Sequence, residues 1–251
     1  MSKSKGNVVD PDDLIKSMGA DTARLFSLFA APPEKDLDWS EQGVEGAFRF
    51  LNRVWRFVET HREALTTATG ARPAELSDIG RAFRRTIHET IQRVTADIED
   101  RFHFNTAISA VHELVNALHA FAAESGDRAA EAERRELLRE AVETVLRLLG
   151  PFAPHVTEEL WSRLGHRTSL FQEAWPVADP EALTRESVAV VVQVDGRVRT
   201  RLTVPPDLSE DGLRSRALGD DRVQPWLAAR EVARVVVVPG RLVNIVTRGS
   251  K

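Results

Sequence analysis

Apolar residues recur every three or four positions through most of the first 165 residues, the spacing that places side chains on one face of an α-helix. Ser40 and Ser77 precede two of these stripes, and serine is a favoured N-cap. Asn105 begins a third stripe, and a fourth ends at Gly150-Pro151, as expected for a C′ glycine followed by proline. Antiparallel packing buries such stripes, so the pattern predicts a helical bundle.

The chain ahead of the bundle begins without a helical period, so the first nine residues are predicted to form a loop. Asp10-Pro11 is typical of an N-cap followed by proline in the first turn, and it predicts a short helix to about Ser17. Gly19 ends that helix. Asp21 is the predicted cap of a second helix, which Pro32-Pro33 stops.

Alternation replaces the helical period near the C-terminus. Val188 to Val194 is a β-branched run, Asp195-Gly196 is a strong hairpin turn, and Val198 to Val204 alternates apolar residues with arginine. Two short helical segments are predicted between residues 209 and 230, followed by a second hairpin around Pro239-Gly240. The predicted fold class is therefore mainly α, an antiparallel helical bundle followed by a small α+β C-terminal domain.

Composition narrows the class of protein. The chain has 251 residues, of which 42% are hydrophobic and 29% charged, enough for one large domain or two modest ones with real cores. It has no cysteine, which excludes disulfides, thiolate metal sites and a cysteine nucleophile within this chain. No stretch approaches the ~20 apolar residues of a membrane span, so we expect a soluble intracellular protein with no membrane partner.

Charge is unevenly distributed along the chain. Residues 1–185 contain 23 Lys and Arg against 30 Asp and Glu, whereas residues 186–251 contain 11 against 8. The basic balance of the second stretch favours contact with a polyanion near the C-terminus, although a solvated surface explains it about as well.

Lysine is rare and concentrated at the N-terminus. Only five of the 34 basic residues are lysine, and four of these five precede residue 36. Ser2-Lys3-Ser4-Lys5-Gly6 brings together two ammonium groups, two hydroxyls and a glycine, which suit the phosphates of a nucleotide. Chance clustering and a disordered chain end are the alternatives.

Other motifs that carry chemistry are sparse. The sequence has no P-loop, GxGxxG after a strand, GxSxG or HExxH. His112 and His119 could share one helical face, and we interpret them as helix-surface or core-edge residues. His155 lies at the start of a predicted helix from about Pro154 to Leu164, where local capping and packing explain it. No metal site is predicted.

Several stretches taken together resemble class I aminoacyl-tRNA synthetases. Met1 to Asn7 looks like the KMSKS signature of that class without its first lysine, and Gly19 to Phe26 continues the match. Pro32 to Trp55 resembles the leucyl-tRNA synthetase family in particular. Pro151 to Trp161 is similar to the bundle of the leucine, valine and isoleucine enzymes. The small terminal domain of the leucine family is matched at Val192–Gly196 and Val238–Val246.

The resemblance implies three parts: a catalytic loop with connecting helices over 1–39, an anticodon-binding-type bundle over 40–180, and a tRNA-binding C-terminal domain over 186–251. In that family the signature loop closes over ATP as the amino acid is activated. Its second lysine, which stabilises the transition-state phosphates, corresponds to Lys3, the expected catalytic residue. Ser2, Lys3, Ser4 and Lys5 are the expected ATP-binding residues. ATP is implied as a substrate accompanied by Mg²⁺, with no cofactor bound within this chain.

tRNA(Leu) is the partner that the resemblance implies. Leucine enzymes are similar to one another in not depending on the anticodon, so contacts to phosphate and ribose are expected. Arg197, Arg199 and Arg201 alternate along one predicted strand and are the candidate tRNA-binding residues, expected on one face. An edge strand kept soluble by charge is the alternative.

The match also has departures. The first signature lysine is missing, Met18 stands where relatives often carry tyrosine, and Asp195 and Thr200 replace the asparagine and glycine common in the terminal hairpin. The nucleotide-binding sheet, the HIGH signature, the leucine pocket and the editing domain have no counterpart in this sequence.

We therefore predict the C-terminal part of a cytoplasmic ligase that activates leucine with ATP and transfers it to tRNA(Leu). This part alone is expected to be inactive, because ATP and leucine bind through the missing core, which an N-terminal synthetase fragment could supply. Two alternatives stay open: a stand-alone, non-catalytic tRNA-binding protein, and the equivalent part of a valine or isoleucine synthetase, which the Pro32 to Trp55 stretch disfavours.

Overall fold

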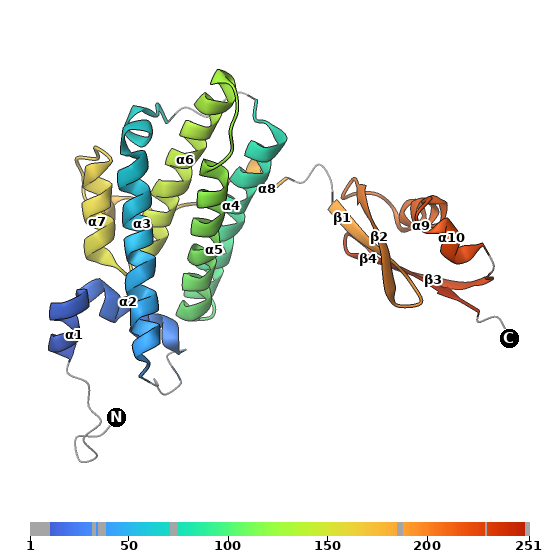
Figure 1. The fold of residues 1–251 in the computed structure, drawn as a ribbon, viewed down its shortest axis with the longest axis horizontal. Helices are drawn as coiled ribbons and strands as arrows, with labels where there is room; N and C mark the ends of the chain where they lie inside the picture. The colour runs from blue at the N-terminus through green and yellow to red at the C-terminus, as the bar shows by residue number, and fades with distance from the viewer. Residues whose placement is uncertain are drawn as a thin grey trace, which may run out of the picture. The chain divides into compact units, whose positions relative to one another are not determined.

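The computed structural model describes residues 11–31, 34, 39–70, 75–184, 188–228 and 230–248 (Figure 1). The chain divides into two compact units, Met1–Leu183 and Thr184–Lys251. Within the described residues the first unit is helical and the second is built on a four-stranded sheet. The predicted mainly α fold with a small α+β part is confirmed. The finer boundary at residue 39 stays a prediction.

The first unit is a bundle of long helices with shorter ones packed against it. Figure 1 shows α3 to α6 as long neighbouring helices, with α7 beside α3 and with α1 and α2 at one end of α3. The bounds are α1 Pro11–Met18, α2 Ala20–Ala30, α3 Glu41–Thr67, α4 Asp78–Glu99, α5 Phe104–Ala122, α6 Arg128–Leu149, α7 Pro154–Arg163, a 3₁₀ turn at Leu170–Gln172, and α8 Pro180–Leu183.

Local side-chain caps begin three of the long helices. The Ser40 hydroxyl accepts a hydrogen bond from the Gly43 amide at 3.1 Å, and the Ser77 hydroxyl accepts one from the Gly80 amide at 3.0 Å. Both confirm the predicted starts of α3 and α4. The Asp127 carboxylate accepts from the amides of Ala129 and Ala130 at the start of α6. Each cap satisfies amides that the helix itself leaves without a partner.

Two predicted helix ends differ in detail. Helix α5 begins at Phe104, one residue before Asn105, and its N-cap His103 makes no side-chain capping bond. Helix α6 ends at Leu149 as expected, but Gly150 is right-handed, with φ −49° and ψ −47°, so it is not a left-handed C′ glycine. Pro151 lacks the amide that would continue the helical hydrogen bonds, and it is sufficient to end the helix.

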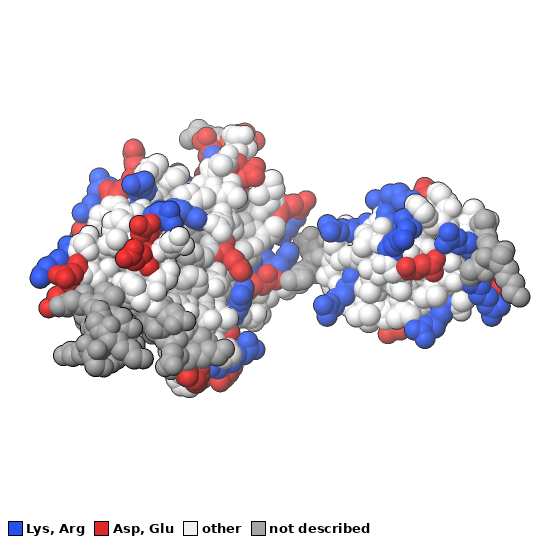
Figure 2. Space-filling model, turned by 60° about the horizontal axis from the view of Figure 1, so that its bottom comes forward, with Lys and Arg blue, Asp and Glu red and all other residues white. Residues whose placement is uncertain are grey.

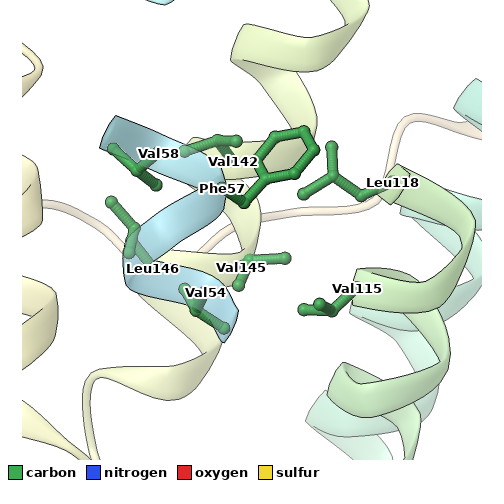
Figure 3. Close-up of a pocket in the computed structure, with 8 residues that line it drawn as sticks. All are labelled: Val54, Phe57, Val58, Val115, Leu118, Val142, Val145 and Leu146. Atoms are coloured by element: carbon green, nitrogen blue, oxygen red, sulfur yellow. The ribbon is translucent and has the colours of Figure 1, made fainter. Parts of the chain in front are cut away.

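The core of the first unit is continuous and tightly filled. Phe83 of α4 stacks on Phe121 of α5 with ring centroids 4.1 Å apart, and Trp161 of α7 is 1% exposed. The close-up in Figure 3 shows valine, leucine and phenylalanine side chains of α3, α5 and α6 surrounding a void of about 10 Å³. This void is at most one water molecule in size and apolar-walled, so it is a packing gap and offers no ligand site.

A buried polar network fastens the end of the first unit to the bundle. Arg84 of α4, 7% exposed, donates to both carboxylate oxygens of Glu140 at 3.1 Å and to Asp179 at 2.8 Å. His88 lies 3.0 Å from Glu140 and accepts from the Asp179 amide. Burial by itself raises the pKa of Glu140, but hydrogen bonds from His88 and Arg84 outweigh it and hold this pKa below its ordinary value.

The second unit is a four-stranded sheet with two helices. Its order is β2-β1-β4-β3, with antiparallel β1–β2 and β3–β4 pairs and a parallel β1–β4 pair between them. The buried side chains of Leu213, Ala217 and Val223 pack on the sheet core, so the helical segment covers one face. The bounds are β1 Val188–Val194, β2 Arg197–Val204, α9 Glu210–Gly219, α10 Gln224–Leu227, β3 Val232–Val238 and β4 Leu242–Thr247.

The predicted turn at Asp195-Gly196 is confirmed and has a further role. Both residues have positive φ, 52° and 75°, as the two-residue hairpin turn requires. Asp195 also accepts hydrogen bonds from the amide and hydroxyl of Thr247 and from Arg230. The Thr247 bonds, assisted by Arg230, hold the pKa of Asp195 below its ordinary value. This carboxylate therefore ties the β1–β2 turn to the end of β4.

A histidine at the edge of the bundle core joins three helices. The ring of His112 on α5 stacks on Phe50 of α3 at 3.5 Å and on Phe29 of α2 at 5.5 Å. Burial, and to a lesser extent the nearby Arg53 guanidinium, lowers the pKa of His112 from 6.5 to about 4. The same two causes, with His61, lower the pKa of His119. The core-edge interpretation of His112 is confirmed.

We expect His112→Phe to flatten the pH dependence of stability. His112 gains its proton near pH 6.5 when unfolded but only near pH 4 when folded, so its contribution to stability is lost as the pH falls between these values. A phenylalanine ring can keep the stack without binding a proton. The urea-unfolding midpoint of the variant should therefore fall less than that of the wild type between pH 6.5 and 4; parallel curves would contradict this.

Candidate functional site

The helices α1 and α2 follow the lysine-rich N-terminus directly. Ser2, Lys3, Ser4 and Lys5 lie outside the described residues. The structure describes the helices that follow them in the chain. Helix α1 is followed by Gly19, whose φ of +86° is accessible at little cost only to glycine, and then by α2. The stretch Met1 to Asn7, which we call the signature segment, precedes α1 in the chain, so the contacts that hold α2 bear on how this segment is attached to the bundle.

Apolar contacts fix the middle of α2 on the bundle. Leu25 is 0% and Phe26 2% exposed, and the Phe26 ring meets the edge of Trp39 with centroids 5.2 Å apart. Gly43 of α3 lies so close that a Cβ there would come within 2.7 Å of the Phe26 ring. Glycine at this position thus permits the close approach of α2 to α3.

Asp21 makes a different contact from the predicted one. Helix α2 begins at Ala20 with Gly19 as its N-cap and without a side-chain capping bond, so Asp21 lies inside the helix. Its carboxylate instead accepts hydrogen bonds from the amides of His155 and Val156, at 3.3 and 2.6 Å. The cap prediction for Asp21 in α2 is wrong, because the acceptor serves the first turn of α7 across the fold.

Two further contacts strengthen this junction. The His155 Nδ1 atom lies 2.7 Å from the same Asp21 carboxylate, and Arg24, three residues further along α2, donates to the Pro151 carbonyl at 3.0 Å. The local capping interpretation of His155 is therefore wrong, because the N-cap of α7 is Ala153 without a side-chain capping bond and the His155 ring contacts a carboxylate of α2. Three stretches that carry the family resemblance, around Asp21, Trp39 and His155, therefore meet in the first unit.

A hollow of about 180 Å³ opens beside the junction. Its wall is mostly apolar, and its Asn52 amide already donates to the Phe48 carbonyl. Among the described residues there is no group of three or more His, Asp and Glu side chains that could hold a metal ion.

The three candidate arginines of β2 do not share one face. Arg201 pairs with Val191 and Arg197 with Val194, and these two β1 partners lie on opposite faces of the sheet. The pairing shifts by one residue between Val192 and Gln193, so β2 carries a β-bulge. The expectation of a single arginine face is wrong because the extra residue reverses the alternation.

Arg199 has a specific neighbour. Its guanidinium lies 3.3 Å from the ring centroid of Trp226 in α10, and this tryptophan is 42% exposed. Arg199 is half-buried, whereas Arg197 and Arg201 are exposed. The Arg199–Trp226 stack places a cation and an aromatic ring together near the surface.

Several arginines of the second unit are already neutralised. Arg214, Arg222 and Arg230 form ion pairs with Asp211, Asp220 and Asp195. Arg201 and Arg234, by contrast, have no ion pair among the described residues. The strand register places Arg201 and Arg234 on the sheet face opposite the helices. On the side of this unit that Figure 2 shows, Lys and Arg side chains are more frequent than Asp and Glu.

Comparison with known families defines the class of protein. Residues 80–213 match the anticodon-binding domain of tRNA ligase, and residues 1–40 match the class I tRNA synthetases for isoleucine, leucine, methionine and valine. The first match covers more than half of the chain, so this chain belongs to the anticodon-binding domain family of tRNA ligases.

More particularly, the chain is similar to the C-terminal region of leucine–tRNA ligases. It is 56% identical over 246 residues to the enzyme of Geobacter sp. (strain M21), and 52% identical over 251 residues to that of Syntrophobacter fumaroxidans. Each match covers 98% of this chain and 29% of the relative, so the chain spans less than a third of their length.

Solved structures agree with this placement. The ternary complex of Agrobacterium radiobacter K84 agnB2 LeuRS with tRNA and LeuAMS matches 99% of this chain and 31% of its own, with a TM-score of 0.84 and 29% identity. A methionyl-tRNA synthetase of Mycobacterium tuberculosis covers 83% of this chain and 40% of its own, with a TM-score of 0.54 and 21% identity, and so shares the fold alone. No helix within the described residues is long and apolar enough to span a membrane.

Sequence reasoning did not identify Trp226, Arg234 or the Asp21–His155 contact as parts of a site. Trp226 lies between Pro225 and Leu227, and a lone aromatic residue in a short helix carries no pattern. Only its pairing with Arg199 distinguishes it. For Asp21 the sequence offered one usable signal. Asp21 lies two residues after Gly19, and because Gly19 is the N-cap, Asp21 is already inside the helix.

Proposed function

We propose that this chain is the C-terminal part of a leucine–tRNA ligase, which activates leucine with ATP and transfers it to tRNA(Leu). The observation that carries the proposal is the 56% identity to a leucine–tRNA ligase along 98% of the chain. The proposal places the ligase in the cytoplasm. The portion of the relatives that the chain does not cover would supply the core that binds leucine and the adenosine of ATP.

The proposed contribution to activation is the signature segment. Lys3 would lie against the phosphates of ATP, where its ammonium group stabilises the negative charge that develops as pyrophosphate leaves. Ser2, Ser4 and Lys5 would bind the phosphates and shape the loop. Mg²⁺ bound with ATP supplies further neutralisation of phosphate charge. The binding energy is most useful when the loop closes only as the reaction proceeds.

The proposed contribution to tRNA binding is backbone contact. Arg201 is the strongest candidate of the three strand arginines, since it is exposed, has no ion pair among the described residues and lies on the face opposite the helices. Arg197 contributes charge on the other face, and Arg199 with Trp226 offers a stacked cation and ring to a ribose or base. Contacts to phosphate and ribose carry affinity without reading the anticodon.

Lys3→Ala tests the catalytic assignment in the complete ligase, meaning this chain together with the preceding portion found in its relatives. Leucine-dependent ATP–pyrophosphate exchange should slow by about 100-fold or more, because one preorganised charge at a transition state contributes about that much. The melting temperature should stay within about 1 °C, since a substitution in the predicted loop should change stability little.

An unchanged exchange rate in Lys3→Ala would overturn the assigned role. If the wild-type chain binds tRNA but supports no exchange with any catalytic portion, the stand-alone tRNA-binding alternative replaces the ligase proposal.

Arg201→Ala tests the tRNA contact in the 251-residue chain itself. A tRNA(Leu) transcript should bind weakly, with affinity that falls steeply as salt rises, because phosphate contact releases counterions. Removing one phosphate contact should reduce the slope of log Kd against log salt concentration by about 1. Filter binding or fluorescence titration from 50 to 300 mM KCl measures it.

Arg214→Ala is the matched control for net charge, since Arg214 lies on α9 in an ion pair with Asp211. It should keep the wild-type slope. Binding that is insensitive to salt, or an equal loss of slope in both variants, would count against Arg201 as a phosphate contact.

A further inference from the structure

We propose that Asp21 is a positioning residue for the activation reaction: its carboxylate, set on the first turn of α7, fixes α1 and α2, and with them the signature segment, relative to the bundle. This inference rests on the proposed function. Asp21 itself is not proposed to contact a substrate. Its role would be to hold α2, and through Gly19 the helix α1 that follows the segment carrying Lys3, on the bundle.

The contact has the features of a strong attachment. One carboxylate accepts from three donors: the Val156 amide at 2.6 Å, the His155 amide at 3.3 Å and His155 Nδ1 at 2.7 Å. Asp21 is only 8% exposed, so water competes little for these bonds. Hydrogen bonds to an ionised acceptor are about twice as strong as neutral ones, and the positive end of a helix favours a carboxylate.

Helix α7 depends on this distant acceptor. Its own N-cap, Ala153, offers no side-chain acceptor, whereas α3, α4 and α6 are capped by the adjacent Ser40, Ser77 and Asp127. Asp21 is 134 residues away from His155 in the sequence. A local cap stabilises one helix, but a cap supplied from another helix also fixes the two helices relative to each other. The start of α7 and the start of α2 are thus coupled.

The attachment lies at the end of α2 that matters for the signature segment. Leu25 and Phe26 bury the middle of α2, and Asp21 and Thr22 of its first turn are buried as well. Apolar packing is not directional, so by itself it does not set the orientation of this end. Asp21, one turn earlier, holds that end, and Arg24 adds a bond to the Pro151 carbonyl at 3.0 Å. Beyond Asp21 the chain passes Gly19 into α1 and then towards Lys3.

A small displacement of α2 would therefore be carried to the signature segment. Catalytic groups must lie close to their productive geometry, and a misplacement of about 1 Å can cost about 100-fold in rate. Loss of the Asp21 carboxylate should lower the rate of activation even though Asp21 touches no reactant. A residue that only stabilised the bundle would instead lower the melting temperature and leave the rate per folded active site unchanged.

The first experiment uses hydrogen–deuterium exchange on the 251-residue chain. In Asp21→Ala, amides of α1 and of the first turn of α7 should exchange at least about tenfold faster, because α7 loses its acceptor and the start of α2, to which α1 is joined through Gly19, loses its attachment. Asp127→Ala is the matched control. It removes an aspartate cap with two amide bonds from α6, and it should leave α1 unchanged. Faster exchange in α7 with no change in α1 would overturn the proposed coupling.

The second experiment measures leucine-dependent ATP–pyrophosphate exchange in the complete ligase, normalised to titrated active sites. We expect kcat to fall about tenfold or more in Asp21→Ala, and to recover most of the wild-type value in Asp21→Asn, whose amide oxygen can still accept from Val156. Asp127→Ala should keep kcat within about twofold despite a comparable loss of melting temperature. Equal kcat in Asp21→Ala and Asp127→Ala would overturn the positioning role.

Lys3→Ala, measured in parallel, separates the two possible failures. If Lys3→Ala abolishes exchange while Asp21→Ala matches the wild type, the ligase proposal survives and the positioning role fails. If Lys3→Ala also matches the wild type, the catalytic assignment itself fails.

Discussion

Burial of the apolar stripe of α5 is the constraint on which the first unit depends. Eight of the 19 residues of this helix are buried, from Ala107 to Phe121, and α2, α3, α4 and α6 all pack against it. At about 25 cal/mol for each Å² of apolar surface removed from water, this is the main source of stability. Hydrophobic burial is not directional, however, so it brings the helices together without settling how the shorter ones are oriented.

Directional polar contacts settle those orientations. Asp21 sets α2 against α7, and Arg84 with Glu140 holds the segment before α8 on α4 and α6. In the second unit Asp195 ties the first hairpin to the end of β4. Each of these groups is a charge with several partners, so leaving any one partner unsatisfied is costly and alternative arrangements are disfavoured. Apolar packing thus brings the helices together, and polar contacts fix their orientation. The proposed coupling of the signature segment to the bundle follows from this division.

Predictions from the sequence succeeded where the deciding information is local. Ser40 and Ser77 cap their helices because the amides they serve lie three residues away, and Asp195-Gly196 forms its turn because both residues tolerate positive φ. Asp21 was misassigned as a cap of its own helix, since nothing near it in sequence reveals α7. The single arginine face failed for a related reason, because a bulge is set by the pairing of β2 with β1.

The sequence by itself determined the helical bundle, the small α+β unit, the family resemblance and the residues Ser2 to Lys5 on which the proposed chemistry depends, because periodicity and short motifs are written in neighbouring residues. Only the tertiary structure decided that Asp21 caps α7, that Arg199 stacks on Trp226, and that Arg201 and Arg197 lie on opposite faces. The partners of Asp21 and Arg199 are distant in sequence, and the faces of β2 follow from its pairing with β1. Such contacts exist only once the apolar core has brought the elements together.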